Sequence, residues 1–254
     1  MTASYLTRER FDSGRVIERT FGAVGANATV LLITALIFVG LPELGLGWGQ
    51  AFLDRMGGDA TTTILLASLV GLVVGTVGNT LMQGAVTHAV IADLQGRKSS
   101  LGASLSAAAG SFWVLLAVGL VSGFAIAFGM ILLIVPGVLV LLAWFVVGPV
   151  VVAERAGVGQ ALARSRDLTR NHRFSILLLM ILYAVVSGVI AVVVGLALFA
   201  VGLVEAGSPG DLIATALVQS VVAMVGATGG AAIYVELRSV KEGGGRDTVA
   251  AIFD

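Results

Sequence analysis

Long apolar blocks separated by short polar segments form the main pattern of the sequence. A helix needs about 20 mainly apolar residues to cross a hydrocarbon core of about 30 Å, and it satisfies its backbone hydrogen bonds internally. Blocks suited to this role cover residues 24–42, 61–83, 112–133, 138–153, 174–199 and 212–235. We therefore expect an all-α, polytopic membrane protein. Residues 1–240 would form one six-helix domain, and residues 241–254 a flexible cytoplasmic tail.

The apolar run from Met130 to Arg155 is too long for one crossing, and Pro136 and Gly137 interrupt it. Proline is suited to the start of a helix and glycine to its end, so the pair predicts a tight turn at the outer face. Pro149 lacks a backbone donor and should kink the short fourth span. The alternative is one broken helix over residues 112–153 with a re-entrant turn, which leaves five spans and places the basic tail outside.

Composition and charge agree with six spans. Of the 254 residues, 57% are hydrophobic and 12% are charged. The mean hydropathy is +1.02, which excludes an ordinary soluble globule. The net charge of zero hides an asymmetry, because Arg55 is the only one of the 15 Lys and Arg residues that falls in a predicted outer loop. Since cytoplasmic loops carry the excess of basic residues, we expect both termini in the cytoplasm.

Three short segments of mixed polarity precede the predicted pairs of spans. They cover residues 15–21, 101–105 and 158–168. Apolar residues at spacings of three and four predict amphipathic helices that lie in the plane of the cytoplasmic interface. Aligning Gly14 with Gly159 also aligns Arg19 with Arg164, which suggests three repeats of an interfacial helix and two spans. The alternative is that any amphipathic segment before a span produces the same likeness.

Small and neutral polar residues recur at every fourth position of the second block. This ridge consists of Ala67, Gly71, Gly75, Asn79, Gln83 and Thr87. One hypothesis is packing, because small residues let helices approach closely and amides form hydrogen bonds between helices. The other is that Asn79, Gln83 and His88 line a polar cavity open to the cytoplasm. The absence of charge from the ridge favours packing.

The predicted spans contain no ionisable group near the middle of the bilayer, where such groups usually serve transport or catalysis. Asp93, Glu154 and Glu236 stand at the cytoplasmic ends of spans, where a solvated or interfacial charge needs no special role. The chain has no Cys and two His residues, which leaves little material for a metal centre. We therefore expect no catalytic residues, no cofactor and no metal.

The most distinctive polar segment covers residues 154–173. Its candidate contacts with lipid headgroups or a protein partner are Arg155, Arg164, Arg166, Arg170 and Arg173. Each basic residue near an anionic membrane surface gains about 1 kcal/mol, so together they provide substantial adhesion without a shaped pocket. The alternative is that most of these residues only determine topology. Asp167 is positioned to pair with Arg164 or Arg170 within the segment.

Several motifs occur in a fixed order within residues 10–240. They are Leu133-Ile-Val-Pro-Gly137, Trp144 followed by Pro149-Val-Val-Val-Ala-Glu-Arg155, Ala161-Leu-Ala-Arg-Ser-Arg-Asp-Leu-Thr-Arg-Asn-His-Arg-Phe174, and Gln83-Gly-Ala with Gly96-Arg-Lys98. In order and spacing they resemble the membrane-domain family named after glycerophosphoryl diester phosphodiesterase, with a departure at Asn171, where that family has glycine. The resemblance implies a six-span bacterial inner-membrane protein, often without an assigned activity. Some members carry a fused soluble phosphodiesterase domain with a catalytic acid, a base and calcium ligands, and we expect no such domain within these 254 residues.

Two main hypotheses about function follow. The first is a non-catalytic inner-membrane protein whose cytoplasmic helices contact membrane lipids, a protein partner or a second copy of the chain in membrane or envelope organisation. The alternative is a transporter or flippase for a neutral or amphiphilic substrate, working through the ridge at Asn79 and Gln83. An intramembrane enzyme is disfavoured, because the sequence places no cluster of His, Asp, Glu or Cys at membrane depth. We expect no nucleic-acid partner.

Overall fold

A computed structural model of the chain describes residues 11–55, 57, 59–94, 100–200, 202, 205 and 208–242. Within these ranges the elements are helical, without strands. In chain order they are α1 (Ser13–Ala35), the π-helix η1 (Leu36–Gly40), α2 (Leu41–Arg55), α3 (Ala60–Leu94), α4 (Leu101–Leu132), α5 (Ile134–Ala143), α6 (Val147–Glu154), α7 (Val158–Thr169), α8 (Arg173–Ala200) and α9 (Pro209–Glu242). The predicted basic loop at Gly96, Arg97 and Lys98 and the tail beyond Glu242 lie outside the described residues.

Six helical segments are long and apolar enough to cross a membrane. They are Ser13–Leu53, Thr61–Asp93, Leu101–Leu132, Ile134–Glu154, Arg173–Ala200 and Pro209–Glu242. The expected all-α, polytopic membrane fold is therefore confirmed.

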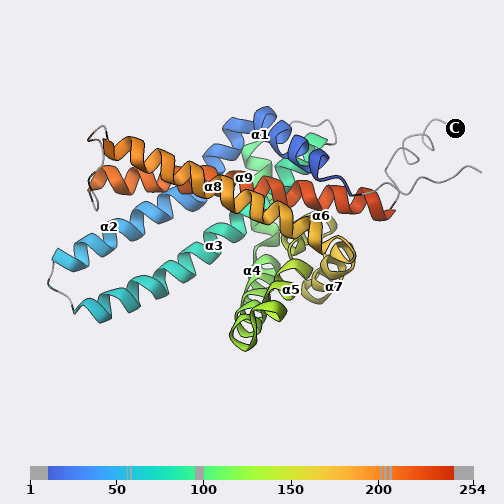
Figure 1. The fold of residues 1–254 in the computed structure, drawn as a ribbon, viewed down its shortest axis with the longest axis horizontal. Helices are drawn as coiled ribbons and strands as arrows, with labels where there is room; N and C mark the ends of the chain where they lie inside the picture. Colours follow the sequence, from blue (N-terminus) through green and yellow to red (C-terminus); the bar gives the residue numbers. More distant parts are fainter. Residues whose placement is uncertain are drawn as a thin grey trace, which may run out of the picture.

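Consecutive long helices form three pairs (Figure 1). α2 packs beside α3, α4 beside α5, and α8 beside α9. In Figure 1 the α2–α3 and α8–α9 pairs extend toward the same side of the molecule, whereas the α4–α5 pair points in another direction. The three pairs diverge from a region formed by the start of α1, by α6 and α7, and by the end of α9, which we call the helix junction.

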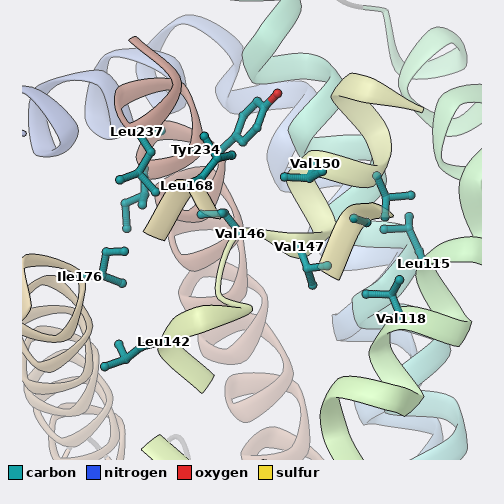
Figure 2. Close-up of a cluster of buried hydrophobic side chains, with 14 of the residues drawn as sticks. Leu115, Val118, Leu142, Val146, Val147, Val150, Leu168, Ile176, Tyr234 and Leu237 are labelled. Carbon is teal, nitrogen blue, oxygen red and sulfur yellow. The ribbon is translucent and has the colours of Figure 1, made fainter. Parts of the chain in front are cut away.

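The main hydrophobic core lies at the helix junction. Figure 2 shows Leu115 of α4 near Val147 of α6, and Leu168 of α7 near Tyr234 of α9. Farther along the pairs the side chains are mostly exposed, and the only fully buried residue of α8 is Ile176, near its start. Apolar side chains are stable when exposed to a bilayer, because lipid tails are equally apolar. The junction therefore holds the helices together, and we expect lipid to cover their distal parts.

A π-helical turn joins α1 to α2 and packs against α3. Pro42 has no backbone N–H, and its ring displaces the carbonyl four residues earlier, which is that of Phe38. The helix widens here, so that Leu41 donates its N–H to the Leu36 carbonyl. The Phe38 carbonyl lies so close to Gly78 of α3 that a Cβ at this position would collide with it. Gly78 is therefore the residue that allows α3 to approach the turn.

Of the three predicted interfacial helices, one is a separate element, one is set off by a kink, and one continues into a span. α7 covers residues 158–168, and soon after its end Asn171 takes a left-handed φ of 73°. Residues 15–21 are instead the first part of α1, which kinks at Asn27 with φ −123° and ψ 21°. Residues 101–105 run into α4 without a break. The prediction of a separate helix is therefore wrong for residues 101–105, whereas the kink at Asn27 sets the helical segment with residues 15–21 apart from the rest of α1.

The turn between the third and fourth spans lies slightly earlier than predicted. Leu133, with φ −164° and ψ 143°, is the single non-helical residue between α4 and α5. Pro136 belongs to the first turn of α5, where its missing donor is not needed. Gly137 does not end a helix, which corrects its predicted role. A Cβ on Gly129 would lie 2.9 Å from the Gly137 Cα, so these glycines let α4 and α5 pack closely.

Pro149 interrupts the fourth span, as predicted. Helical geometry is lost between Trp144 and Val146, and Pro149 lies in the first turn of α6. The break precedes the proline because its ring clashes with the carbonyl four residues earlier. The interruption places the end of α5 within reach of α7.

Candidate functional site

α7 has one buried face and one open face. Ala161, Ser165 and Leu168 are fully buried. The hydroxyls of Ser165 and Thr169 donate to the Ala143 carbonyl at 3.0 Å and 3.2 Å. This carbonyl stands at the end of α5, where helices leave acceptors without internal donors. The two bonds fix how α7 is rotated about its axis, and this rotation decides which arginines face outward.

Arg164 faces inward and joins three helices. Its Nε donates to both carboxylate oxygens of Glu154 at 3.1 Å and 3.2 Å. The Tyr234 hydroxyl of α9 donates to the same carboxylate at 3.0 Å. Arg164 also pairs with Glu242, which accepts from Arg238 Nε at 2.6 Å. The structure thus places this candidate lipid contact in an ion-pair network that ties α6, α7 and the end of α9 together.

Arg166 and Arg170 face the opposite way and are exposed. Among the described residues, neither has a carboxylate within ion-pair distance. They line a shallow, open depression of about 730 Å³ beside the start of α8. Its lining is Ala163, Arg166, Asp167, Arg170, Asn171, Arg173 and Phe174, and we call it the arginine groove. The groove gathers three of the five predicted arginines, whereas Arg155 is exposed at the end of α6 with a left-handed φ of 51° and does not line it.

Arg173 adds an unsatisfied donor to the arginine groove. It is partly buried, and its Nε is shielded from solvent without a hydrogen-bond acceptor among the described residues. A buried donor without an acceptor costs about 1–3 kcal/mol, so an external acceptor that reaches this Nε would relieve the cost. α8 begins at Arg173, so the positive end of its helix dipole lies at the same place.

Asp167 is the single carboxylate in the lining of the groove. It lies 3.6 Å from Lys241 Nζ at the end of α9, and the same ammonium group donates to its backbone carbonyl. Its predicted pairing with Arg164 or Arg170 is therefore replaced by a pairing with a distant residue. The carboxylate also borders a second depression of about 500 Å³, lined in addition by Glu154, Ala156, Gln160, Ala163 and Arg164. The charged groups of that second depression are already paired within the protein.

His172 stands between α7 and α8, next to the groove. Burial lowers the pKa of its imidazole below the ordinary value of 6.5, and the nearby Lys241 ammonium lowers it further. Its ring lies 5.5 Å from the ring of Phe11, measured between centroids. His172 is therefore favoured in its neutral form at neutral pH and adds no charge to the groove.

The polar ridge of α3 does not form a single packing face. Asn79 is exposed, and Gln83 is partly buried against α6, where a Cβ on Gly148 would lie 2.5 Å from its Oε1. His88 is partly buried, and its Nδ1 has no partner among the described residues. Close approaches occur instead at Gly78 and at Gly84, where a Cβ would lie 3.0 Å from the Ala108 Cα of α4. Neither depression described above is lined by the ridge residues.

Glu236 of α9 is a charged residue whose role the sequence did not reveal. Its side chain is 0% exposed, and it lies 2.7 Å from Arg19 Nη1 and 3.6 Å from Arg15 Nε. It also accepts from the Asp12 backbone N–H at 3.3 Å. The expectation of a solvated or interfacial charge without a special role is wrong at this position, because the carboxylate joins α1 to α9 through buried ion pairs. A usable signal was present, since Arg15 and Arg19 lie four residues apart and therefore share one face of α1.

The described residues contain no group of three or more His, Cys, Asp or Glu side chains placed to hold a metal ion. The side chains of the arginine groove are suited to binding anions, because guanidinium groups recognise carboxylate and phosphate oxygens through paired donors. Comparisons of the chain with protein-family models, with curated proteins and with solved structures found no match. The resemblance of its motifs to a phosphodiesterase-linked membrane domain therefore stays a prediction.

Proposed function

We propose that the protein is a non-catalytic bacterial inner-membrane protein that binds anionic lipid headgroups at its cytoplasmic face and acts in membrane organisation. The observation that supports this proposal is the division of α7 into an inward face, where Arg164 is paired, and an outward face, where Arg166 and Arg170 have no carboxylate partner among the described residues. Paired arginines support the fold, whereas unpaired ones remain available to an external anion.

The position of the arginine groove supports a lipid as the anion. Arg173 and Phe174 open a helix that is apolar enough to span a bilayer, so we expect the groove to lie where a span meets water. Headgroup phosphates are found at this depth. Each basic residue there contributes about 1 kcal/mol of attraction to an anionic surface.

Lipid retention tests the proposal. The protein is purified in a neutral detergent, supplied with an equal mixture of phosphatidylglycerol and phosphatidylcholine, and its bound lipids are counted by native mass spectrometry. We expect the unmodified protein to retain more phosphatidylglycerol than phosphatidylcholine. The double substitution Arg166→Gln and Arg170→Gln should reduce the free energy of this preference by about 2 kcal/mol if the two contributions add, which corresponds to roughly thirty-fold in the ratio of bound lipids.

The matched control removes two other exposed arginines, Arg55 and Arg155. Arg55→Gln combined with Arg155→Gln changes the net charge equally but leaves the groove intact, so the lipid preference should persist. Equal loss in both double variants, or no preference in the unmodified protein, would contradict the proposal.

The transporter hypothesis stays a separate prediction. It depends on a polar path at Asn79 and Gln83, and Gln83 packs against Gly148 of α6. Substrate flux that falls in Asn79→Leu combined with Gln83→Leu, with lipid retention unchanged, would support it over the lipid-binding proposal.

A further inference from the structure

The arginine groove holds more positive charge than a single phosphodiester neutralises. Arg166, Arg170 and Arg173 contribute three positive charges, and Asp167 contributes one negative charge that Lys241 already faces at 3.6 Å. A phosphodiester headgroup carries one negative charge. A phosphomonoester carries about 1.5 to 2 at pH 7, because its second pKa is near 6. Charge complementarity therefore favours the monoester.

The arrangement of the donors favours the same group. Arg166 lies on the outward face of α7, and Arg170, four positions later, directly follows the last residue of this helix, so their side chains emerge on the same side. Arg173 approaches from the start of α8 and brings an Nε that lacks an acceptor among the described residues. A monoester presents three terminal oxygens to donors from two directions, whereas a diester presents two.

An apolar surface continues from the groove along α8. Phe174 is 71% exposed at the edge of the groove, and Leu178 and Ile181 follow it with 51% and 50% exposure. Residues spaced three and four apart lie on one helix face. A phosphate attached to acyl chains can therefore bind at the arginines while its chains lie along this face, which free phosphate cannot do.

We propose that the arginine groove is a specific site for the phosphomonoester headgroup of a membrane lipid of the phosphatidate type. This inference rests on the proposed function, since it assumes that the groove faces anionic lipid. It adds that the headgroup is selected by its charge and its number of terminal oxygens, and that the acyl chains contribute through Phe174.

The test measures the affinity of the full chain in neutral detergent for three probes by isothermal titration calorimetry. The probes are dioctanoyl phosphatidate, dioctanoyl phosphatidylglycerol and inorganic phosphate. We expect phosphatidate to bind at least about tenfold more tightly than phosphatidylglycerol. Raising the pH from about 6 to about 8 should strengthen phosphatidate binding as the monoester loses its second proton, and should leave phosphatidylglycerol binding unchanged.

Two variants and one control assign the site. Arg170→Gln should weaken phosphatidate binding about tenfold, whereas the exposed Arg155→Gln outside the groove should change it less than about twofold. Phe174→Ala should weaken phosphatidate binding and leave inorganic phosphate unaffected. Size-exclusion profiles confirm that each variant folds, which is expected because Arg170, Arg155 and Phe174 are exposed.

The possible failures are distinct. Equal affinity for phosphatidate and phosphatidylglycerol, with loss of both in Arg170→Gln, overturns the headgroup selection and leaves the proposed function intact. Inorganic phosphate that binds as tightly as phosphatidate overturns the lipid source. Binding of all anionic lipids that is insensitive to Arg170→Gln overturns both the inference and the proposed function.

Discussion

Arginines occupy two regions of the helix junction, the start of α1 and the length of α7, in contrasting ways. At the start of α1, Arg15 and Arg19 converge on Glu236, which is 0% exposed. Along α7, Arg164 pairs with Glu154, which is 24% exposed, while Arg166 and Arg170 remain open. The first region is a closed charge cluster between α1 and α9, and the second is a charge cluster with an open groove beside it.

The difference between the two regions follows from where carboxylates lie near the ends of the spans. Glu236 lies near the end of α9 and next to the start of α1, and both nearby arginines of α1 reach it. Glu154 ends its span beside α7, but it lies on the inward side of α7, so only Arg164 reaches it. An arginine near a membrane surface is thus structural or available for binding according to the helix face from which it emerges.

The largest expected effect concerns the closed cluster. Glu236→Gln leaves two arginines without their buried partner, and breaking a buried ion pair usually costs about 3–5 kcal/mol. Because Arg19 and Arg15 are 25% and 35% exposed and can turn toward water, we expect a loss of about 2–3 kcal/mol in unfolding free energy. Thermal unfolding in detergent measures it.

Glu242→Gln is the matched control, because Glu242 is a glutamate of the same helix that pairs with two arginines but is 37% exposed. The loss of unfolding free energy in Glu242→Gln should be clearly smaller than the loss in Glu236→Gln. Equal melting temperatures for the two variants would contradict the distinction between a closed and an open region.

The second prediction separates the inward and outward arginines of α7. Arg164→Gln removes a partly exposed charge-assisted pairing with Glu154 and should cost about 1 kcal/mol of unfolding free energy. Arg166→Gln, two positions along the same helix, should change it by less than about 0.5 kcal/mol. For lipid retention the order should reverse. If the same variant showed the larger loss in both unfolding free energy and lipid retention, the division of α7 into two faces would be wrong.

A weaker pH dependence is expected from His172, which stands between α7 and α8. The folded protein holds the pKa of His172 below 6.5, through burial first and Lys241 second. The unfolded chain therefore takes up a proton at a higher pH than the folded protein, and stability falls as the pH drops through 6.5. His172→Gln should remove this part of the slope in melting temperature between about pH 7.5 and 5.5. An identical slope in the variant would contradict it.

The apolar blocks predicted the spans well, because the thickness of the bilayer sets the length of its helices regardless of how they pack. The presence of Pro149 also predicted the interruption of the fourth span, because proline disturbs the helix only in its immediate neighbourhood. Pro42 offered a similar local signal for the π-helical turn at Phe38, but its consequence at Gly78 depends on the neighbouring helix.

The candidate site was predicted only in part, because partner choice depends on tertiary structure. The sequence grouped Arg155, Arg164, Arg166, Arg170 and Arg173 by composition, and three of these five line the arginine groove. The sequence did not distinguish Arg164 from the other four arginines. Arg164 meets its partner Glu154 only because the chain changes direction at Arg155 and brings α7 back beside the end of α6. Likewise the burial of Glu236 follows from the packing of α1 on α9, whose residues lie more than two hundred positions apart along the chain.

The proposed topology places α7 and the start of α1 on one aqueous face of the membrane, opposite the connection between α8 and α9. Because the chain has no Cys, single substitutions Glu18→Cys, Arg166→Cys and Glu205→Cys at exposed positions can each be labelled with a membrane-impermeant maleimide. We expect labelling of the Glu205 variant in intact spheroplasts, and of the Glu18 and Arg166 variants only after the membrane is opened. Labelling of the Glu18 and Arg166 variants from opposite faces would contradict it.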